Sequence, residues 1–220
     1  MLPAGAASPP EAFRRLLEAR APAFGLLLSE PAVARLSRFL ARLDDARRQT
    51  NLTGPLSIEE LADHALESVL GERLLPPRAE VVDIGSGAGF PGIPIAIVRP
   101  DLGLSPIEPR RKRSAFLDAV SREIGVENVF APEANVNNLP GNSVDAALAR
   151  AVGKVDEILG EARFLKSGGL FLAWTTTSNV AALTRRLAPF FSAQEPLPVP
   201  ESRHKVIAPF RKTVPRGTQE

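Results

Sequence analysis

The segment from Val81 to Gly92 constrains the fold more than any other stretch of this chain: Val-Val-Asp-Ile-Gly-Ser-Gly-Ala-Gly-Phe-Pro-Gly. It begins with a short apolar, β-branched run, which predicts a buried strand. Four glycines follow within eight residues, and glycine allows sharp turns and the close approach of a ligand to the main chain. Residues 93–98 predict a helix with Pro91 or Pro94 in its first turn. This order of elements is typical of a nucleotide-type cofactor site at the edge of a parallel sheet.

Two kinds of cofactor fit this layout. The spacing Gly87-x-Gly89-x-x-Gly92 matches the dinucleotide fingerprint. A dinucleotide, however, places its pyrophosphate on the free N–H groups of the helix N-terminus. The acidic Asp83 at the strand tip and the two prolines after the loop suit that poorly. They favour a cofactor with a cationic end and no phosphate, such as S-adenosylmethionine.

A second acidic residue supports a cofactor with a ribose. Glu108 lies 19 positions beyond Gly89, at the tip of the next apolar run, residues 102–107. A carboxylate at this place accepts hydrogen bonds from both ribose hydroxyls. The alternative is that Glu108 is a solvated charge at the end of a strand.

The rest of the chain after residue 79 alternates between strand and helix patterns. We expect strands at 80–84, 103–108, 127–130, 143–149 and 168–174, and helices near 91–99, 110–124, 153–165 and 178–189. This alternation predicts a doubly wound α/β fold, a mostly parallel sheet with helices on both faces. Residues 195–199 and 204–210 have no helix between them, so they predict a C-terminal hairpin with an antiparallel last strand.

The N-terminal third has helical patterns. We expect helices at 11–20 and 31–49, and a third that starts with the capping-box sequence Ser57-Ile-Glu-Glu and runs to about Leu75. Pro76 and Pro77 mark a boundary. The predicted organisation is therefore a disordered tail at 1–10, a helical cap at 11–77 and a cofactor-binding domain at 78–220.

Composition excludes several classes of protein. The chain has no cysteine, which excludes disulfide frameworks and structural zinc fingers, and we predict no metal site. No run of 18 apolar residues and no signal peptide is present, so we expect a cytoplasmic protein. The formal net charge is only +2, and nucleic-acid binding would therefore depend on local patches. We expect a monomer.

The sequence from Asp83 to Pro94 resembles the first motif of the bacterial small-subunit rRNA methyltransferase G family, also called glucose-inhibited division protein B. Its Phe-Pro-Gly-Ile-Pro tail is more specific than the glycines. Further matches occur in the same order: Asn51-Leu52-Thr53, Lys112-Arg113 with Phe116-Leu117, Arg150-Ala151 and Arg211-Lys212-Thr213. The resemblance covers residues 30–214 and implies a class I methyltransferase fold and methylation of guanine N7 in 16S rRNA, as naked RNA or in the small ribosomal subunit.

The resemblance also implies site residues. S-adenosylmethionine would be bound by the glycine-loop segment, by Glu108, and by a loop over the adenine: Asp83, Gly85, Ser86, Gly87, Gly89, Phe90, Glu108, Val136 and Asn137. The family usually has Arg-Val-Glu-Glu in that last loop, so Asn135, Asn137 and Asn138 are departures. Hydrogen bonds to the adenine from the main chain of Val136 and Asn137 would not depend on these side chains. Arg150 would contact the methionine part or the target guanine, and it is the candidate catalytic residue. The alternative to these contacts is that Arg150 forms a structural salt bridge with Asp83 or Asp145.

Cations outside the cofactor site are candidates for RNA binding. Arg35, Arg38 and Arg42 form a stripe on the helix at 31–49, and a run of four cations that includes Lys112 and Arg113 follows Glu108. Phosphate contacts would explain both groups, and solvated helix faces are the alternative. The resemblance adds Asn51 to the RNA-binding residues.

The composition also narrows the chemistry. Methylation at carbon 5 of a pyrimidine needs a thiolate nucleophile, which this chain lacks. Attack by the in-plane lone pair of guanine N7 needs neither nucleophile nor strong base, so catalysis would be mainly placement. Residues 137–140 lack the aromatic ring that enzymes methylating amino groups stack on a base. The alternatives are a non-catalytic RNA- or ribosome-binding protein, suggested by the altered loop at 135–138 and by Asp63, and a nicotinamide-dependent dehydrogenase.

Overall fold

The computed structural model describes residues 9–50, 52–131, 136–151, 155–160 and 162–213. Helical segments come first along the chain: α1 (Pro10–Arg20), η1 (Ala21–Phe24), α2 (Glu30–Gln49), α3 (Ile58–Leu70) and η2 (Gly71–Leu74). Alternating strands and helices follow: β1 (Glu80–Ile84), α4 (Gly92–Val98), β2 (Gly103–Ile107), α5 (Arg111–Glu123), η3 (Val136–Asn138), β3 (Val144–Arg150), α6 (Val155–Leu159), β4 (Leu165–Thr176) and α7 (Thr177–Leu187). The last strands are β5 (Phe191–Ala193), β6 (Leu197–Pro198) and β7 (Lys205–Lys212).

The strands form one sheet in the order β2-β1-β3-β4-β7-β5, with β6 also paired to β7. The pairs β1–β2, β1–β3 and β3–β4 are parallel, and β7 runs antiparallel to β4. The mostly parallel sheet and its antiparallel last strand are therefore confirmed. Strand order reverses at β1, which has β2 on one side and β3 on the other. Ligands bind at such a switch point, beyond the carboxyl ends of the strands.

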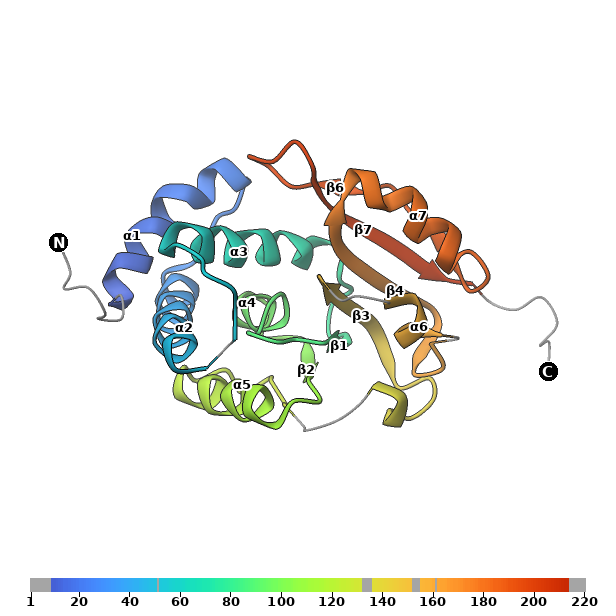
Figure 1. The fold of residues 1–220 in the computed structure, drawn as a ribbon, viewed down its shortest axis with the longest axis horizontal. Coiled ribbons are helices and arrows are strands. Elements are labelled where there is room, and N and C mark those ends of the chain that lie inside the picture. Colours follow the sequence, from blue (N-terminus) through green and yellow to red (C-terminus); the bar gives the residue numbers. More distant parts are fainter. Residues whose placement is uncertain (1–8, 51, 132–135, 152–154, 161, 214–220) are drawn as a thin grey trace.

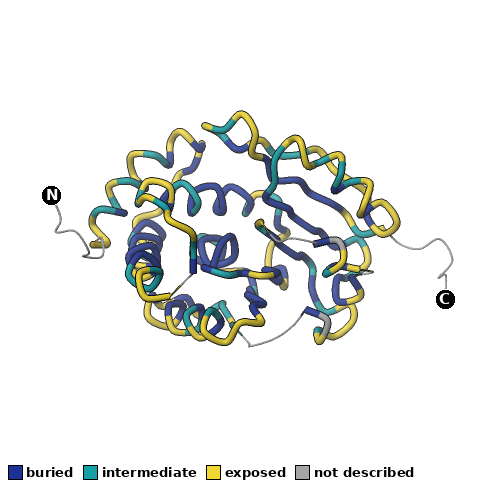
Figure 2. The backbone as a smooth tube through the Cα atoms, in the orientation of Figure 1, coloured by how far each residue is buried: buried dark blue, intermediate teal, exposed yellow. Residues whose placement is uncertain are grey.

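Apolar side chains fill both sides of the sheet. One cluster joins residues of α1 to α5 to one face, and a second cluster joins α6 and α7 to the other. Figure 1 shows α1 and α2 on the opposite side of the molecule from α7. Figure 2 shows strands buried between helices whose outward residues are exposed. The two-sided covering matches the doubly wound fold that the sequence predicts.

The N-terminal helices pack directly on the sheet. Leu61 and Leu66 of α3 belong to the same apolar cluster as Leu104 of β2 and Leu172 of β4. The predicted capping box is present at the start of α3, where the Ser57 hydroxyl accepts from the Glu60 N–H and the Glu60 carboxylate accepts from the Ser57 N–H. The helical cap thus shares a core with the sheet, and a domain boundary at residue 77 stays a prediction.

Two predicted elements are shorter in the structure. The strand expected at 127–130 is reduced to one parallel bridge, Leu104 to Val129, because this segment lies at the edge of the sheet beside β2. The helix expected at 153–165 is described only as α6, and Gly160 and Ala162 adopt positive φ, which ends a right-handed helix.

The C-terminal hairpin is confirmed, since β6 and β7 pair antiparallel. The sequence did not predict β5, which pairs with the end of β7. Within the described part of the chain, no helix has the length and apolar character needed to cross a membrane.

Candidate active site

The glycine loop lies between β1 and α4, at the switch point of the sheet. Gly85, Gly87 and Gly89 all have positive φ, between 56° and 97°. Residues other than glycine rarely adopt such values. The Gly85 N–H donates to the carbonyl of Ile107 at 2.9 Å, so the loop is fastened to the end of the neighbouring strand β2. The sharp turns that the sequence predicts at these glycines are confirmed.

Asp83 lies beneath this loop and is fully buried. Its Oδ2 accepts from the Ser86 hydroxyl at 2.5 Å and from the Gly92 N–H at 3.0 Å. Its Oδ1 is also buried, and it has no hydrogen-bond partner among the described residues. Burial raises the pKa of Asp83 to about 6, and the nearby Glu108 adds to the rise. A cation bound here would lower that pKa again, because opposite charge favours the ionised carboxylate.

Gly92 has no room for a side chain. A Cβ at this position would lie 2.7 Å from Oδ2 of Asp83 and 3.0 Å from the Leu104 side chain. The absence of a side chain lets the first N–H of α4 reach the Asp83 carboxylate, which is favourably placed at a helix N-terminus. The fourth glycine of the motif is therefore explained by packing against the strand-end acid.

Glu108 follows β2 and is 4% exposed. One of its carboxylate oxygens accepts from the Gly87 N–H at 3.1 Å and the other from the Arg110 N–H at 3.0 Å. The guanidinium of Arg113 lies 3.9 Å away. The structure brings Glu108 against the glycine loop, so the solvated alternative is wrong. Each carboxylate oxygen accepts one hydrogen bond here and has capacity for another.

The predicted adenine loop is described in part. Val136 begins η3 and is buried in the same cluster as Ile84 and Ile107, the last residues of β1 and β2. Val136 therefore lies beside the switch point, as expected. Asn135 and the side chain of Asn137 lie outside the described residues.

Phe90 joins the glycine loop to the helical cap. Its ring is 8% exposed and makes edge contacts with Phe39 of α2 at 5.6 Å and His64 of α3 at 5.9 Å between ring centroids. Desolvation, followed by the repulsion from Arg150 and Lys205, lowers the pKa of His64 to about 4, so His64 is neutral at pH 7. A direct contact between Phe90 and a cofactor stays a prediction, and its side chain has a packing role that the motif did not reveal.

Arg150 ends β3, and the alternative of a salt bridge to Asp83 or Asp145 is wrong, because Arg150 pairs with another acid. Its guanidinium binds the Glu67 carboxylate of α3 at 2.6 Å, and it donates to the His64 carbonyl at 3.1 Å. It also lies 5.9 Å above the centre of the Phe90 ring. Burial lowers the pKa of Arg150, and the attraction of Glu67 and Asp83 opposes this.

Glu67 and Lys205 complete this cluster, and neither was a candidate from the sequence. Glu67 is 4% exposed, and its second oxygen binds Lys205 of β7 at 2.5 Å. A glutamate three positions after His64, on the apolar face of the helix, was a possible signal, since buried carboxylates are rarely unpaired. Its partners lie 83 and 138 positions further along the chain, and no motif relates them.

The predicted RNA-binding cations occupy different environments. On α2, Arg38 donates to the Ile124 carbonyl at 3.4 Å, and Arg42 binds Glu123 at 2.8 Å and Asp45 at 3.1 Å. Arg35 lines a cavity with Ile97 and Pro100.

At the start of α5, Lys112 is exposed and Arg113 is partly buried beside Glu108. Asn51 lies outside the described residues.

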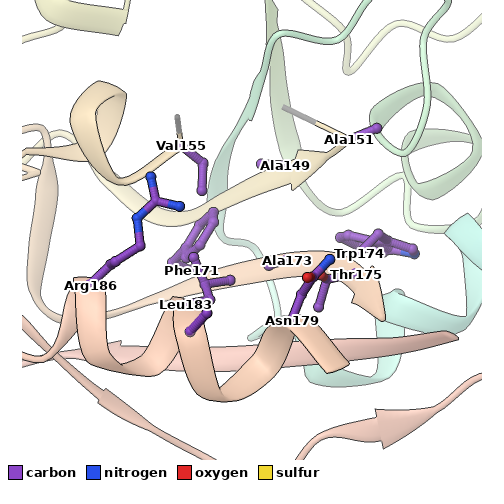
Figure 3. A pocket seen from close by; sticks show the side chains of 11 residues that line it. Ala149, Ala151, Val155, Phe171, Ala173, Trp174, Thr175, Asn179, Leu183 and Arg186 are labelled. Atoms are coloured by element: carbon purple, nitrogen blue, oxygen red, sulfur yellow. The ribbon is translucent and has the colours of Figure 1, made fainter. Parts of the chain in front are cut away.

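Two hollows meet at the carboxyl end of β4, around Ala151, Trp174 and Thr175. One has a volume of about 300 Å³ and lies on the α7 side of the sheet, where Asn179, Leu183 and Arg186 face β3 and β4 (Figure 3). The other, of about 170 Å³, lies between α3 and the ends of β3 and β4 and is lined by Glu67, Arg150 and Lys205 among others.

Comparison with known proteins agrees with this geometry. Solved structures with the same fold include a SAM-dependent methyltransferase from Aquifex aeolicus, with a TM-score of 0.56 and 18% identity over 67% of this chain and 89% of that one. A SAM-dependent O-methyltransferase from Thermotoga maritima has a TM-score of 0.53 and 18% identity over 81% of this chain and 73% of that one. These similarities confirm the class I methyltransferase fold.

Sequence relatives are closer. A protein from Halorhodospira halophila named Ribosomal RNA small subunit methyltransferase G is 35% identical over 162 residues, which are 73% of this chain and 77% of that one. A protein of the same name from Wolinella succinogenes is 38% identical over 129 residues, 59% of this chain and 67% of that one. The family model described as rRNA small subunit methyltransferase G matches residues 32–205. The chain therefore belongs to the rRNA small subunit methyltransferase G family.

Proposed function

We propose that this protein methylates 16S rRNA of the small ribosomal subunit with S-adenosylmethionine as the methyl donor, and that the acceptor is N7 of a guanine. Family membership supports the reaction and the kind of substrate. The dehydrogenase and the non-catalytic alternatives are not favoured by that membership. The position of the acceptor atom rests on the resemblance of the 83–94 motif and on the absence of cysteine.

One observation supports the choice of cofactor most directly. The main-chain N–H groups that a pyrophosphate would need are already bonded to carboxylates, Gly92 to Asp83 and Gly87 to Glu108. A phosphate in the same place would meet two negative side chains instead of free donors. A cationic, phosphate-free cofactor fits these residues, because the buried Oδ1 of Asp83 has no partner among the described residues and its carboxylate is poorly solvated.

The residues proposed to hold the cofactor divide into two groups. Asp83 supplies negative charge beneath the glycine loop, and Glu108 offers carboxylate oxygens to the ribose hydroxyls. The main chain of the glycine loop and of the Val136–Asn137 segment provides close contact surfaces, for which small or main-chain groups are suited. Arg150 lies between the loop and the cap, where it would face the methionine part or the target base.

The residues of this chain need to position the reactants and do not need to move a proton. When bound, S-adenosylmethionine supplies an electrophilic methyl group, which the lone pair of guanine N7 accepts with release of S-adenosylhomocysteine. A positive charge would be present at the site before and after transfer, and the negative charges of Asp83 and Glu108 would stabilise it. Holding the two atoms in line at near-attack distance accounts for most of the expected rate.

RNA contacts are proposed at the start of α5. Lys112 is exposed and Arg113 lies beside Glu108, so phosphates bound there would lie next to the cofactor site. Contacts from Arg35, Arg38, Arg42 and Asn51 stay predictions. Because the proposed substrate is the small ribosomal subunit or its RNA, we place the protein in the cytoplasm. We also propose that it acts as a monomer.

The test uses small subunits from a strain that lacks the modification. The wild-type protein is expected to transfer labelled methyl groups to 16S rRNA, and borohydride reduction with aniline cleavage should locate the product, since both steps require 7-methylguanosine. Calorimetry should show binding of S-adenosylhomocysteine and none of NADH, and a Glu108→Ala variant should lose both binding and transfer. Binding of NADH alone would overturn the cofactor assignment, and absence of transfer despite cofactor binding would overturn the substrate.

A further inference from the structure

The smaller hollow at the carboxyl edge of the sheet combines charged side chains with an aromatic ring. It has a volume of about 170 Å³ and lies where α3 meets the ends of β3 and β4 and the start of β7. This volume is below the range of pockets that hold cofactors and drug-sized ligands. Trp174, the single tryptophan of the chain, lines it.

A buried carboxylate organises the charges of this hollow. Glu67 is 4% exposed and binds Arg150 at 2.6 Å and Lys205 at 2.5 Å, one cation on each carboxylate oxygen. The side chain of Arg150 is 14% exposed and that of Lys205 is 45% exposed. The cluster carries a net positive charge, with Arg150 on the wall and Lys205 toward solvent.

Arg150, which lines this hollow, also lies over the residue that follows the third glycine of the loop. Arg150 lies 5.9 Å above the ring of Phe90, the residue that follows Gly89. Trp174 is held in place because its indole N–H donates to the Glu67 carbonyl at 2.9 Å. Trp174 also lines the larger hollow on the α7 side, but Glu67, Arg150 and Lys205 are not among that hollow's lining residues.

We propose that the hollow between α3 and the ends of β3 and β4 receives the RNA nucleotide that accepts the methyl group, with Lys205 binding its phosphate and Arg150 facing its base. This inference rests on the proposed function. Enzymes that modify a base take it out of the stack and hold it in a pocket against flat side chains, which Trp174 provides. Glu67 is a positioning residue, because each of its carboxylate oxygens is bound to one of the two cations.

Lys205 offers a matched experiment. Lys166 also binds a carboxylate, Asp145 at 2.8 Å, and its side chain is 44% exposed, but it lies at the amino end of β4. In Lys205→Gln, the KM for small subunits should rise about tenfold, and the slope of log KM against log salt should fall by roughly one, the loss of one phosphate contact. In Lys166→Gln, both quantities should stay at the wild-type values. Both variants should bind S-adenosylhomocysteine like the wild type.

Glu67 is tested by a pair of variants. Glu67→Gln removes the charge that holds Arg150 and Lys205, and it should lower methyl transfer more than it lowers affinity for S-adenosylhomocysteine. Glu67→Asp keeps the charge and should restore part of the transfer. Trp174 fluorescence serves as a folding control, since its hydrogen bond goes to the main chain of residue 67 and not to the substituted side chain.

Direct binding is measured with guanosine monophosphate as the probe. In protein saturated with S-adenosylhomocysteine, the nucleotide should quench Trp174 fluorescence, and Lys205→Gln should require about ten times more of it, while Lys166→Gln should not. Equal KM, salt slope and quenching in Lys205→Gln and wild type would overturn the inference. If the wild type binds S-adenosylhomocysteine but methylates no RNA, the proposed function fails, and the quenching of Trp174 still decides the nucleotide site.

Discussion

At the amino end of the sheet, acidic side chains are partly exposed and each is bonded to a cation and to a main-chain N–H group, whereas at the carboxyl end they are buried. Asp101, just before β2, forms two hydrogen bonds with Arg99, at 2.7 and 2.8 Å. These bonds hold the pKa of Asp101 well below its usual range. Asp145, near the start of β3, binds Lys166 at 2.8 Å. Every carboxylate oxygen of Asp101 and Asp145 has a protein partner.

The acidic side chains at the carboxyl end are more deeply buried, and one of them has an oxygen without a hydrogen-bond partner among the described residues. Asp83 is fully buried with one oxygen unpartnered among the described residues, and Glu108 and Glu67 are each 4% exposed. Burial of this kind is unfavourable unless each charge has specific partners. The amino end is therefore arranged for stability, and the carboxyl end keeps poorly solvated charges where a ligand would complete them.

The largest expected difference in unfolding free energy is between variants of two arginines. Arg150 binds an acid at the carboxyl end of the sheet, and Arg99 binds acids at the amino end. Arg150→Gln should lower the free energy of unfolding by about 3 kcal/mol, because it breaks a buried ion pair. Arg99→Gln should cost about 1 kcal/mol, since its acidic partners are partly exposed. Urea denaturation measures both values.

Salt sharpens this comparison. Raising the salt concentration from 0.1 to 1 M should shrink the effect of Arg99→Gln, because exposed charges are screened, and leave that of Arg150→Gln nearly unchanged. Equal losses in the two variants, with equal salt dependence, would contradict the distinction between the two ends.

A smaller effect is expected at Gly92. Gly92→Ala should lower the free energy of unfolding by about 2 kcal/mol, because the new methyl group meets Oδ2 of the buried Asp83. Affinity for S-adenosylhomocysteine should fall roughly tenfold, about 1.4 kcal/mol. The matched control is Gly54→Ala, where an added Cβ has no atom within 4 Å. If both variants behave alike in calorimetry and denaturation, the proposed packing of Gly92 is wrong.

The sequence was sufficient for the parts of the site that lie close together along the chain. The glycines, Asp83 and Glu108 occupy one strand-loop-helix-strand unit, so their spacing alone determines that they meet. The capping box of Ser57 is local in the same sense, and both predictions are confirmed. The alternation of elements also predicted the parallel sheet and its antiparallel last strand.

Contacts between distant elements were beyond the sequence. Glu67 meets Lys205 across 138 positions, and this pairing depends on how α3 packs over the ends of β3 and β4. The same limit explains Arg42, whose charge on α2 seemed available until α5 placed Glu123 beside it. A single sequence shows which charges exist, whereas tertiary packing decides which of them are already paired.

A pH experiment separates the half-buried His64 from the buried Asp83. Between pH 4 and 6.5, the unfolded chain binds more protons at His64 than the folded protein, because the pKa of His64 is lowered to about 4. Stability should therefore rise with pH on account of His64. The pKa of Asp83 is raised to about 6, so the folded protein binds more protons there, and stability should fall from pH 4 to 6 on account of Asp83.

These two slopes oppose each other in the wild type. Each is at most about 1.4 kcal/mol per pH unit. Relative to wild type, His64→Gln should make stability fall more steeply with pH in this window, and Asp83→Asn should make it rise. Thermal unfolding at pH 4, 5 and 6 measures the slopes as differences from wild type, so that unaffected groups cancel. Parallel curves for all three proteins would show that neither group has a perturbed pKa.

The smallest effects are expected for two predicted RNA-binding cations, one at each end of α5. Arg42 of α2 contacts the last residue of α5, and Lys112 lies in its first turn. Arg42 binds Glu123 and Asp45, so its charge is neutralised by the protein, whereas Lys112 is exposed in the first turn of α5. Arg42→Gln should change stability by at most about 1 kcal/mol and leave the salt dependence of methylation unaltered. Lys112→Gln should leave stability unaltered and lower the slope of log KM against log salt by roughly one. A reduced slope in Arg42→Gln would instead mean that RNA displaces Glu123 and Asp45, and that the α2 stripe contacts phosphate as its sequence first suggested.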